Sequence, residues 1–442
     1  MERDLKITIK DCDLSAYEYL KKWYEEGQVE KKINYAGRIY DHEELDNLLE
    51  ASNEFWLTHG KWCNQFEKEF SEYLGVRYSS FVNSGSSANL LAFMTLTSPL
   101  LGDRQIKRGD EVITVACCFP TTVAPIIQYG AVPVFVDVNI NTLNIDVTEL
   151  EKAVSEKTKA IILAHTLGNP FDLDTVLKFC SENDLWLIED NCDSLGSKYS
   201  RQYTGTFGDI ATSSFYPPHH ITTGEGGMVY TDNPLLHKII LSMRDWGRDC
   251  TCASGEDNKC GHRFSGQHGS LPEGYDHKYV YSHFGYNMKA TEMQGAIGCA
   301  QLKKLPKFIE DRRNNFQQML QFMFHYSEYF HLPYSEDEAH PSPFGFWLTV
   351  KEDAPFKRKD IVNYLEKKGI QTRMVFAGNI LRQPLFSTLQ EGVDYIVSDW
   401  LIHTDYIMEN TFWIGVYSGI GWKELKYIKE TFTEFLGVNW NE

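Results

Sequence analysis

Two adjacent histidines, His219 and His220, stand just before a glycine-rich turn in the stretch SFYPPHHITTGEGG, residues 214–227. An imidazole with an ordinary pKa near 6.5 can accept and release a proton at neutral pH. A side chain positioned in this way can act as a general base on a bound molecule. Either histidine could instead be a structural residue, which is the commoner case for a lone histidine.

Two further segments could bind a phosphate group. Gly85 and Ser86 stand in NSGSSANLLAF, where a helix is expected to begin. The free N–H groups and the dipole of a helix start favour an anion, although small residues there are also common as ordinary caps. Ser214 could add a hydroxyl, and the glycines of residues 224–227 allow the backbone to turn sharply beside a ligand.

A flat heteroaromatic ring could lie between two other residues. Asp190 ends the apolar strand LWLIED, where a carboxylate can pair with a pyridinium nitrogen and make the ring an electron sink. Phe119 follows another strand and could lie against the ring. The alternatives are a turn-forming or capping aspartate and a core phenylalanine.

Four cysteines could hold an inorganic group: Cys192, Cys250, Cys252 and Cys260. Four thiolates can bind a [2Fe-2S] cluster, and a glycine-rich loop could close over it. Zinc is the competing metal, with His262 and His268 as further ligands, although a CxC spacing fits the usual zinc loops poorly. The other six of the ten cysteines are taken as core or incidental residues.

Composition limits the function classes. The formal net charge of -18 disfavours nucleic acid, whose phosphates are bound mainly by Lys and Arg. The first residues carry scattered charges, and nowhere do about 18 apolar residues run together, so we expect no membrane segment and a cytoplasmic protein.

Strand-like and helix-like segments alternate through the middle of the chain. This pattern predicts an α/β fold with a mostly parallel central sheet and helices on both faces. Ligands of such sheets bind beyond the carboxyl ends of the strands. For 442 residues we expect three parts. They are a helical lead-in at 1–65, a large domain at 66–300 with a Cys- and Gly-rich loop at 245–280, and a small α+β domain at 301–442.

In their order and approximate distances, these segments resemble the DegT/DnrJ/EryC1/StrS sugar aminotransferase family from about residue 35 to the end. The resemblance implies the fold of type I pyridoxal-phosphate enzymes. An EDxxxxxG motif is matched at residues 189–196 and a Ser-Phe-x-x-x-Lys-x-x-Thr-x-Gly-Glu-Gly-Gly motif at 214–227. His219 replaces the Schiff-base lysine, and an imidazole cannot form that bond. The keto-sugar 3-dehydratases of the family have the same His-His replacement.

The cysteine pattern also resembles one subset, the iron-sulfur CDP-4-keto-6-deoxyglucose 3-dehydratases. This resemblance implies pyridoxamine 5'-phosphate (or PLP) held without a covalent bond, with His219 removing a C4' proton while the C3 hydroxyl leaves as water. The substrate would be a nucleotide-linked 4-keto-6-deoxy sugar, most readily the CDP form, on the route to a 3,6-dideoxyhexose. An NADH-dependent flavin and iron-sulfur reductase would deliver electrons singly through the cluster.

The resemblance assigns further residues. Asn287 and Lys289 would reach the phosphate of the other subunit in a homodimer. Asp193, Tyr216 and His220 would lie near the ring. Arg373, in TRMVFAGN, could form bidentate hydrogen bonds with a substrate diphosphate.

Three alternative functions stay open. The first is a cluster-free 3-dehydratase of a GDP- or dTDP-4-keto sugar that regenerates its cofactor from glutamate. The second is a non-catalytic relative that binds a sugar nucleotide. The third is an ordinary aminotransferase, which residues 214–227 disfavour because they contain no lysine. No motif in the sequence indicates which nucleotide base the substrate carries.

Overall fold

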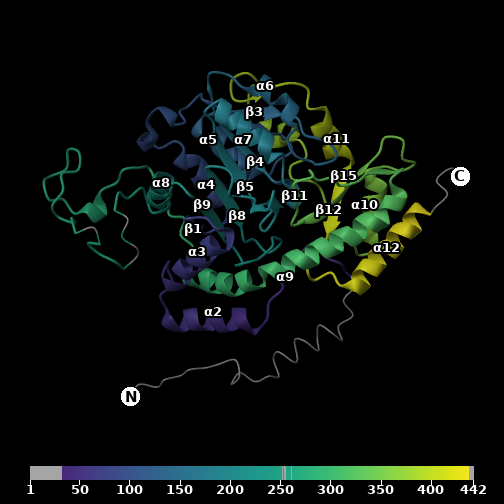
Figure 1. Ribbon diagram of the computed structural model, residues 1–442, viewed down its shortest axis with the longest axis horizontal. Helices are drawn as coiled ribbons and strands as arrows, with labels where there is room; N and C mark the ends of the chain where they lie inside the picture. The colour runs from purple at the N-terminus through teal and green to yellow at the C-terminus, as the bar shows by residue number, and fades with distance from the viewer. Residues whose placement is uncertain (1–31, 251, 253–254, 260, 438–442) are drawn as a thin grey trace, which may run out of the picture.

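An eight-stranded sheet forms the centre of the computed structural model (Figure 1), which describes residues 32–250, 252, 255–259 and 261–437. Its strands, in spatial order, are β1 (Tyr78–Val82), β9 (Gly227–Thr231), β8 (Ile210–Ser214), β5 (Trp186–Asp190), β4 (Thr158–Ala164), β2 (Glu111–Val115), β3 (Val132–Val136) and β14 (Ile396–Val397). Only the pairings of β9 are antiparallel. The mostly parallel sheet expected from the sequence is thus confirmed. The first half of the expected lead-in, before residue 32, lies outside the described residues.

Both faces of this sheet are buried because its strands are apolar at successive positions. In β4, Ile161 and Leu163 join the core on one face, and Ala160 and Ile162 join the core on the other. Side chains of a strand alternate in direction, so each face needs its own covering layer. Helices α4 (Gly85–Thr95) and α8 (Pro234–Arg244) pack on one face. The other face is covered by α3 (Lys61–Leu74), α7 (Leu173–Glu182) and α9 (Glu292–Met323).

The remaining elements complete the layers around this sheet. The other helices are α2 (His42–Glu54), α5 (Pro120–Tyr129), α6 (Leu150–Ala153), α10 (Arg358–Lys367), α11 (Ile402–Asn410) and α12 (Trp422–Leu436). Short 3-10 turns are η1 (Pro99–Arg104), η2 (Val147–Glu149), η3 (Thr166–Gly168), η4 (His277–Tyr279), η5 (Phe324–Tyr326), η6 (Ile380–Arg382) and η7 (Pro384–Phe386). A three-stranded sheet joins β11 (Ala339–His340), β6 (Lys198–Tyr199) and β7 (Gln202–Tyr203).

The carboxy-terminal part forms a second, antiparallel sheet beside the first. Its order is β10 (Phe330–His331), β12 (Gly345–Val350), β15 (Thr411–Gly415) and β13 (Thr372–Arg373). It is reached through α9, a single helix of 32 residues that contains Pro306, where the sequence left one or two helices open.

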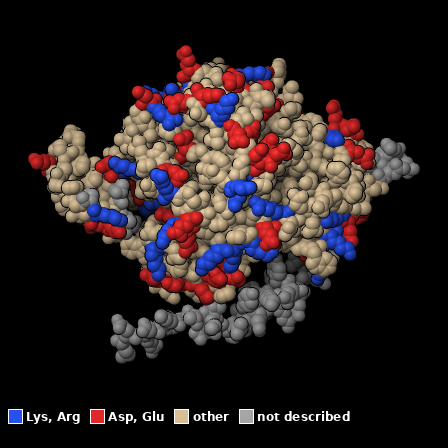
Figure 2. Space-filling model, viewed as in Figure 1, with Lys and Arg blue, Asp and Glu red and all other residues tan. Residues whose placement is uncertain are grey.

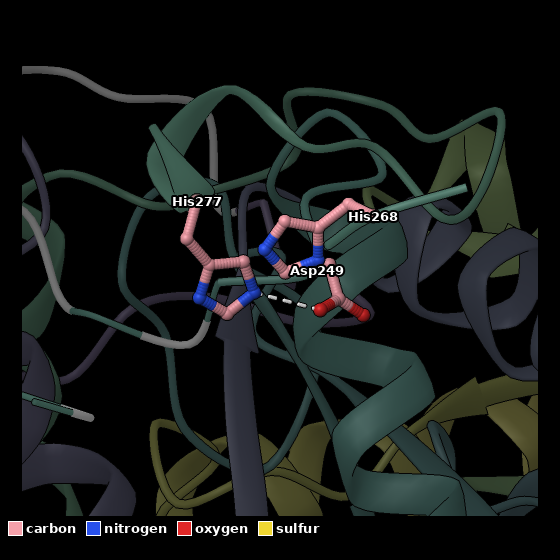
Figure 3. A group of neighbouring side chains, drawn as sticks. All are labelled: Asp249, His268 and His277. Atoms are coloured by element: carbon pink, nitrogen blue, oxygen red, sulfur yellow. Dashed lines mark hydrogen bonds and ion pairs between the residues drawn. The ribbon is translucent and has the colours of Figure 1, made fainter. Parts of the chain in front are cut away.

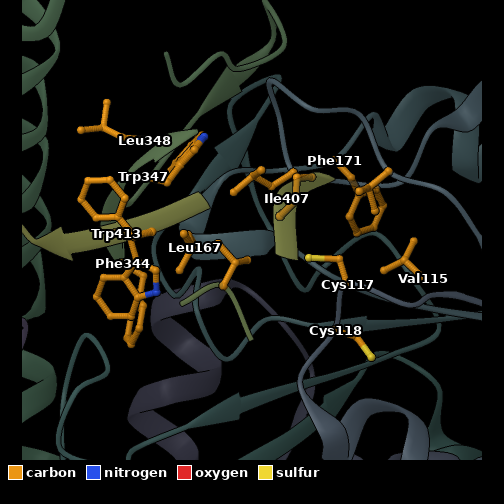
Figure 4. Packing of buried hydrophobic residues seen from close by; sticks show 14 of the residues in the cluster. Val115, Cys117, Cys118, Leu167, Phe171, Phe344, Trp347, Leu348, Ile407 and Trp413 are labelled. Carbon is orange, nitrogen blue, oxygen red and sulfur yellow. The ribbon is translucent and has the colours of Figure 1, made fainter. Parts of the chain in front are cut away.

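One apolar core joins the two sheets. In Figure 4, Trp347 of β12 and Trp413 of β15 lie in the same cluster as Cys117 and Leu167, which follow β2 and β4 of the large sheet. β14 also pairs with β3, so the carboxy-terminal part is tied to the large sheet at its edge. This shared burial positions β13 and the segment before β12 over the carboxyl ends of the parallel strands.

The loop between α8 and α9 extends away from the body of the molecule at the left of Figure 1. Its first turn requires glycine at position 247, where φ is +84° and an added Cβ would lie 1.9 Å from the His283 carbonyl oxygen. Farther along, Arg263 donates to both carboxylate oxygens of Asp276, at 3.0 and 2.8 Å. The described part of this loop is therefore held by specific polar contacts.

The surface shown in Figure 2 carries basic and acidic side chains interspersed with one another. None of the described helices has the length and apolar character needed to cross a membrane.

Candidate active site

A cavity of about 430 Å³ lies at the carboxyl ends of β1, β2, β4, β5 and β8. It brings together ten of the residues singled out in the sequence: Gly85, Ser86, Phe119, Asp190, Cys192, Asp193, Ser214, Tyr216, His219 and Arg373. No lysine is among the described residues that line it. The position of the cavity follows from the parallel sheet, which gathers the segments after several strands at one edge.

One end of the cavity is the start of α4. Ser84 caps this helix by accepting a hydrogen bond from the Ser87 N–H at 3.1 Å. Gly85 and Ser86 lie in the first turn, where backbone N–H groups have no acceptor within the helix. A Cβ on Gly85 would lie 2.4 Å from the Ser214 Cβ, so only glycine lets Ser214 approach this turn. The arrangement suits a phosphate group.

Asp190 lies on the floor of the cavity with its carboxylate fixed in place. Its Oδ2 accepts hydrogen bonds from Asn89 Nδ2 and Thr122 Oγ1, both at 2.8 Å, and its Oδ1 accepts one from the Cys192 N–H at 3.2 Å. Asn89 is itself held by Thr212, whose hydroxyl donates to Asn89 Oδ1 at 2.6 Å. The carboxylate is only 4% exposed and is oriented before any ligand binds.

His219 lies beside Asp193 and Phe344 at the same cavity. Its Nδ1 is 3.5 Å from Asp193 Oδ1, and its ring centroid is 5.1 Å from that of Phe344. Both His219 Nδ1 and Asp193 Oδ2 are buried without a hydrogen-bond partner among the described residues. Buried polar atoms are rarely left unpaired, so these two indicate room for a polar ligand.

Burial keeps both members of this pair neutral. It lowers the pKa of His219 to about 3, and the charge of Arg312 acts in the same direction. It raises the pKa of Asp193 to about 8, and the charge of Asp190 adds to that effect. At neutral pH the contact therefore joins a neutral imidazole and a neutral carboxyl, and the imidazole is in the form that accepts a proton.

The low pKa of His219 gives an expected pH profile. If His219 is the base, kcat/KM should stay level from about pH 7 down to about pH 5, because the imidazole stays unprotonated well below its usual pKa of about 6.5. Initial rates in buffers of constant ionic strength measure this profile, with enzyme stability checked at each pH. An acid limb centred near the ordinary imidazole value would contradict it.

The neighbouring His220 points away from this cavity and lines a small one behind it, near Arg312. Its Nε2 donates to the Ser342 carbonyl oxygen at 2.9 Å. From α9, Arg312 donates to the carbonyl oxygens of Pro218 and His219 at 3.3 and 3.2 Å. These contacts fix the backbone that carries His219.

The mouth of the cavity is aromatic and basic. Phe119 and Tyr216 are about half exposed, at 49% and 48%, and both line the cavity. The Arg373 guanidinium lies 3.9 Å over the Tyr35 ring and donates to the Thr372 carbonyl oxygen at 2.7 Å. An anionic group entering the cavity would meet this charge.

Lys289 lines a different cavity, of about 720 Å³, which residues of α3 and α8 also line. Asn287 contacts Lys289. Lys289 Nζ lies 3.0 Å from Asn287 Oδ1, 3.3 Å from Asp245 Oδ1 and 3.6 Å from the centre of the Trp246 ring. Within one chain these residues do not reach the cavity of His219. Their predicted contact with the phosphate of another subunit stays a prediction.

The described cysteines are not gathered into one site. Cys192 lines the cavity of His219, and Cys250 and Cys252 line the larger cavity. Cys260 lies outside the described residues. Burial raises the pKa of Cys192, and the Asp190 charge acts in the same direction. Because only three of the four cysteines are described, the four-thiolate site for a [2Fe-2S] cluster stays a prediction.

Four residues of the site escaped the sequence analysis. Asn89 and Thr122 hold Asp190, Arg312 holds the His219 backbone, and Phe344 packs on the His219 ring. The position of Asn89, one turn into the helix that begins at Gly85, is a local signal that could have been followed. The contacts of Arg312 and Phe344 have no local signal, because both residues come from distant parts of the chain.

Comparison with known proteins gives one family and three similar proteins. The DegT/DnrJ/EryC1/StrS aminotransferase family matches residues 38–433. Over 404 residues, the chain is 52% identical to the lipopolysaccharide biosynthesis protein RfbH of Salmonella typhimurium, covering 91% of this chain and 92% of that protein. It is 47% identical over 404 residues to the dTDP-4-dehydro-2,6-dideoxy-D-glucose 3-dehydratase of Saccharopolyspora spinosa, covering 91% and 86%. The E. coli GDP-4-keto-6-deoxy-D-mannose-3-dehydratase, solved with bound hydrated PLP, superposes with a TM-score of 0.80 at 32% identity, covering 90% of this chain and 98% of that one.

Proposed function

Because this chain belongs to the DegT/DnrJ/EryC1/StrS aminotransferase family, we propose that it is a 3-dehydratase that removes the C3 hydroxyl of a nucleotide-linked 4-keto-6-deoxyhexose. The observation that carries the proposal is a histidine in place of the family's lysine, in a cavity with no lysine among its described lining residues. A transaminase of this family needs that lysine to hold its cofactor. Elimination of the C3 hydroxyl needs a base but does not need a lysine that holds the cofactor covalently.

The cavity fits pyridoxamine phosphate, or PLP. When bound, this cofactor supplies an amine that can join a ketone and a ring that draws electrons. The first turn of α4 and the Ser214 hydroxyl bind its phosphate, Asp190 pairs with its ring nitrogen, and Phe119 lies against its ring. These assignments use the fixed carboxylate and the close contact of Gly85 with Ser214 described above.

His219 moves the proton in this scheme. Its neutral imidazole accepts a proton at the cofactor's C4' and can return it to the C3 hydroxyl as that group leaves as water. Asp193 beside it holds the ring orientation, and Arg312 holds the backbone. Tyr216 lies near the ring and Arg373 binds the substrate diphosphate at the mouth.

Two parts of the proposal can be tested: the nucleotide of the substrate, and the source of the electrons that replace the C3 hydroxyl by hydrogen. Two of the relatives are named for dTDP- and GDP-linked sugars, which supports one of these nucleotides in the substrate. These are the substrates of the cluster-free form of the proposal, in which glutamate restores the cofactor's amine. The CDP-linked, iron-sulfur form with an NADH-dependent reductase is supported only by the spacing of Cys192, Cys250, Cys252 and Cys260. The resemblance to RfbH supports a product for a surface polysaccharide. We also propose a homodimer, with Asn287 and Lys289 serving the other subunit.

A substrate panel tests the function directly. The purified chain is incubated with pyridoxamine phosphate, with glutamate or a reductase and NADH, and with the CDP-, dTDP- and GDP-linked 4-keto-6-deoxyhexoses. Mass spectrometry follows the replacement of the C3 hydroxyl by hydrogen, a net loss of one oxygen atom from the released sugar. We expect loss of the C3 oxygen in one nucleotide series. Transfer of an amino group to C4 with the C3 oxygen retained would contradict the proposal.

The same reactions distinguish the cluster-free form of the enzyme from the iron-sulfur form. Iron and sulfide are measured on protein purified without oxygen, and turnover is measured with glutamate alone or with a reductase and NADH. Sustained turnover with glutamate and without iron supports the cluster-free form. Dependence on iron and on the reductase supports the iron-sulfur form.

A further inference from the structure

Three side chains of the loop between α8 and α9 converge on one point (Figure 3). They are Asp249, His268 and His277, and one potential metal-ligating atom of each lies within 4.8 Å of those of the other two. His277 Nε2 lies 2.7 Å from Asp249 Oδ2, and the two imidazole rings are stacked with centroids 4.8 Å apart. Apart from the loop cysteines, Asn287 and Lys289, the residues used in the proposed dehydration are far from this group in sequence.

One nitrogen of the His268 ring has no hydrogen-bond partner among the described residues. Its Nε2 is buried and makes no hydrogen bond to any described residue. The ring is accommodated by Gly266, where a Cβ would lie 2.6 Å from that nitrogen. A buried imidazole nitrogen without a partner costs free energy, so a ligand that uses this ring would relieve the cost.

The backbone around the three residues is already ordered. The Asp249 N–H donates to the Val280 carbonyl oxygen at 2.9 Å, and the His277 N–H donates to the Arg263 carbonyl oxygen at the same distance. The two-point contact between Arg263 and Asp276 fixes the residue next to His277. Preorganised side chains lose little entropy when they bind an ion.

We propose that Asp249, His268 and His277 bind one Zn²⁺ ion, with water completing the coordination. Two imidazoles and one carboxylate suit zinc, which takes nitrogen and oxygen ligands at about 2.0–2.2 Å. Mg²⁺ and Ca²⁺ are bound mainly through oxygen atoms, which disfavours them here. Side-chain movements of roughly an ångström would bring the three atoms to these distances.

The ion joins Asp249 to His277, 28 positions later, two residues that already share a hydrogen bond. Linking the ends of a long segment lowers its conformational entropy. The site does not depend on the proposed dehydration, and it uses none of the four cysteines.

Zinc titration tests the site on the full-length chain. The background carries Cys250→Ser, Cys252→Ser and Cys260→Ser, so that thiolates cannot bind the metal. Isothermal titration calorimetry is expected to give one Zn²⁺ per chain. His268→Ala in this background is expected to weaken the affinity at least roughly tenfold. His262→Ala, a histidine of the same loop outside the group, is the matched control and is expected to keep the affinity.

A spectroscopic measurement on the unsubstituted chain tests the metal site without relying on variants that could misfold. Co²⁺ bound by nitrogen and oxygen should show visible ligand-field bands without a thiolate-to-metal charge-transfer band, and Zn²⁺ should displace it. Zinc binding that His268→Ala leaves unchanged, or that vanishes with the three serine substitutions, overturns the proposal. Neither result bears on the sugar assay, so the two proposals fail separately.

Discussion

His219→Asn is expected to lower the rate of water loss by about 10²- to 10⁴-fold, the usual contribution of a general base. Asparagine is close in size to the imidazole and keeps a polar side chain beside Asp193, but it cannot take up a proton. Cofactor binding should change little, because neither the start of α4 nor Asp190 is altered. Stopped-flow or mass-spectrometric turnover gives the rate, and absorbance titration gives the cofactor affinity.

His220→Gln is the matched control for this substitution. The glutamine amide can still donate to the Ser342 carbonyl oxygen, which His220 Nε2 contacts at 2.9 Å. Its turnover should stay within a few-fold of the parent, because His220 faces the small cavity behind the site. Deuterium uptake from solvent at C4' of added pyridoxamine phosphate gives a second reading of the proton transfer. Normal uptake and turnover in His219→Asn would exclude this residue as the base.

Asp190→Asn is expected to lower kcat by about 10²- to 10³-fold, the range for loss of one preorganised electrostatic contact in a catalytic site. The amide keeps the size of the carboxylate but carries no charge to pair with a protonated ring nitrogen. It also presents donors where Asn89 and Thr122 now donate to the carboxylate. The affinity for pyridoxamine phosphate should fall as well, because hydrogen bonds to charged groups contribute about 1.5–3 kcal/mol.

Asp209→Asn provides the comparison at the opposite end of the neighbouring strand. Asp209 Oδ2 accepts a hydrogen bond from the Leu187 N–H at 2.9 Å, a bond that an asparagine oxygen can also accept. This variant is expected to keep its cofactor affinity and kcat. Equal losses in both variants would mean that the effect of Asp190→Asn comes from the sheet and not from the cofactor site.

Much of the fold could be predicted from local sequence. The strands β2, β3, β4, β5 and β8 each correspond to a short segment recognisable in the sequence, and the parallel order of the first four follows from the helices between them. The residues after these strands then meet at one edge of the sheet, so Phe119, Asp190 and Ser214 could be assigned to one site before any coordinates were known. The absence of a lysine from residues 214–227 is a fact of sequence alone.

Contacts between distant segments could not be predicted in this way. Nothing near Arg312 indicates that it binds the carbonyl oxygens of Pro218 and His219, and nothing near Cys192 indicates that Cys250 and Cys252 line another cavity. The same holds for Asp249, His268 and His277, because their spacing matches no common metal motif.

The sequence by itself determined which chemical groups are present and which of them follow a strand or begin a helix, because backbone preference and side-chain alternation act over a few residues. Only the tertiary structure decided that burial makes His219 and Asp193 neutral, which cavity each cysteine faces, and where the three metal-binding side chains meet. These properties depend on the dielectric surroundings and on the close packing of elements far apart in the chain.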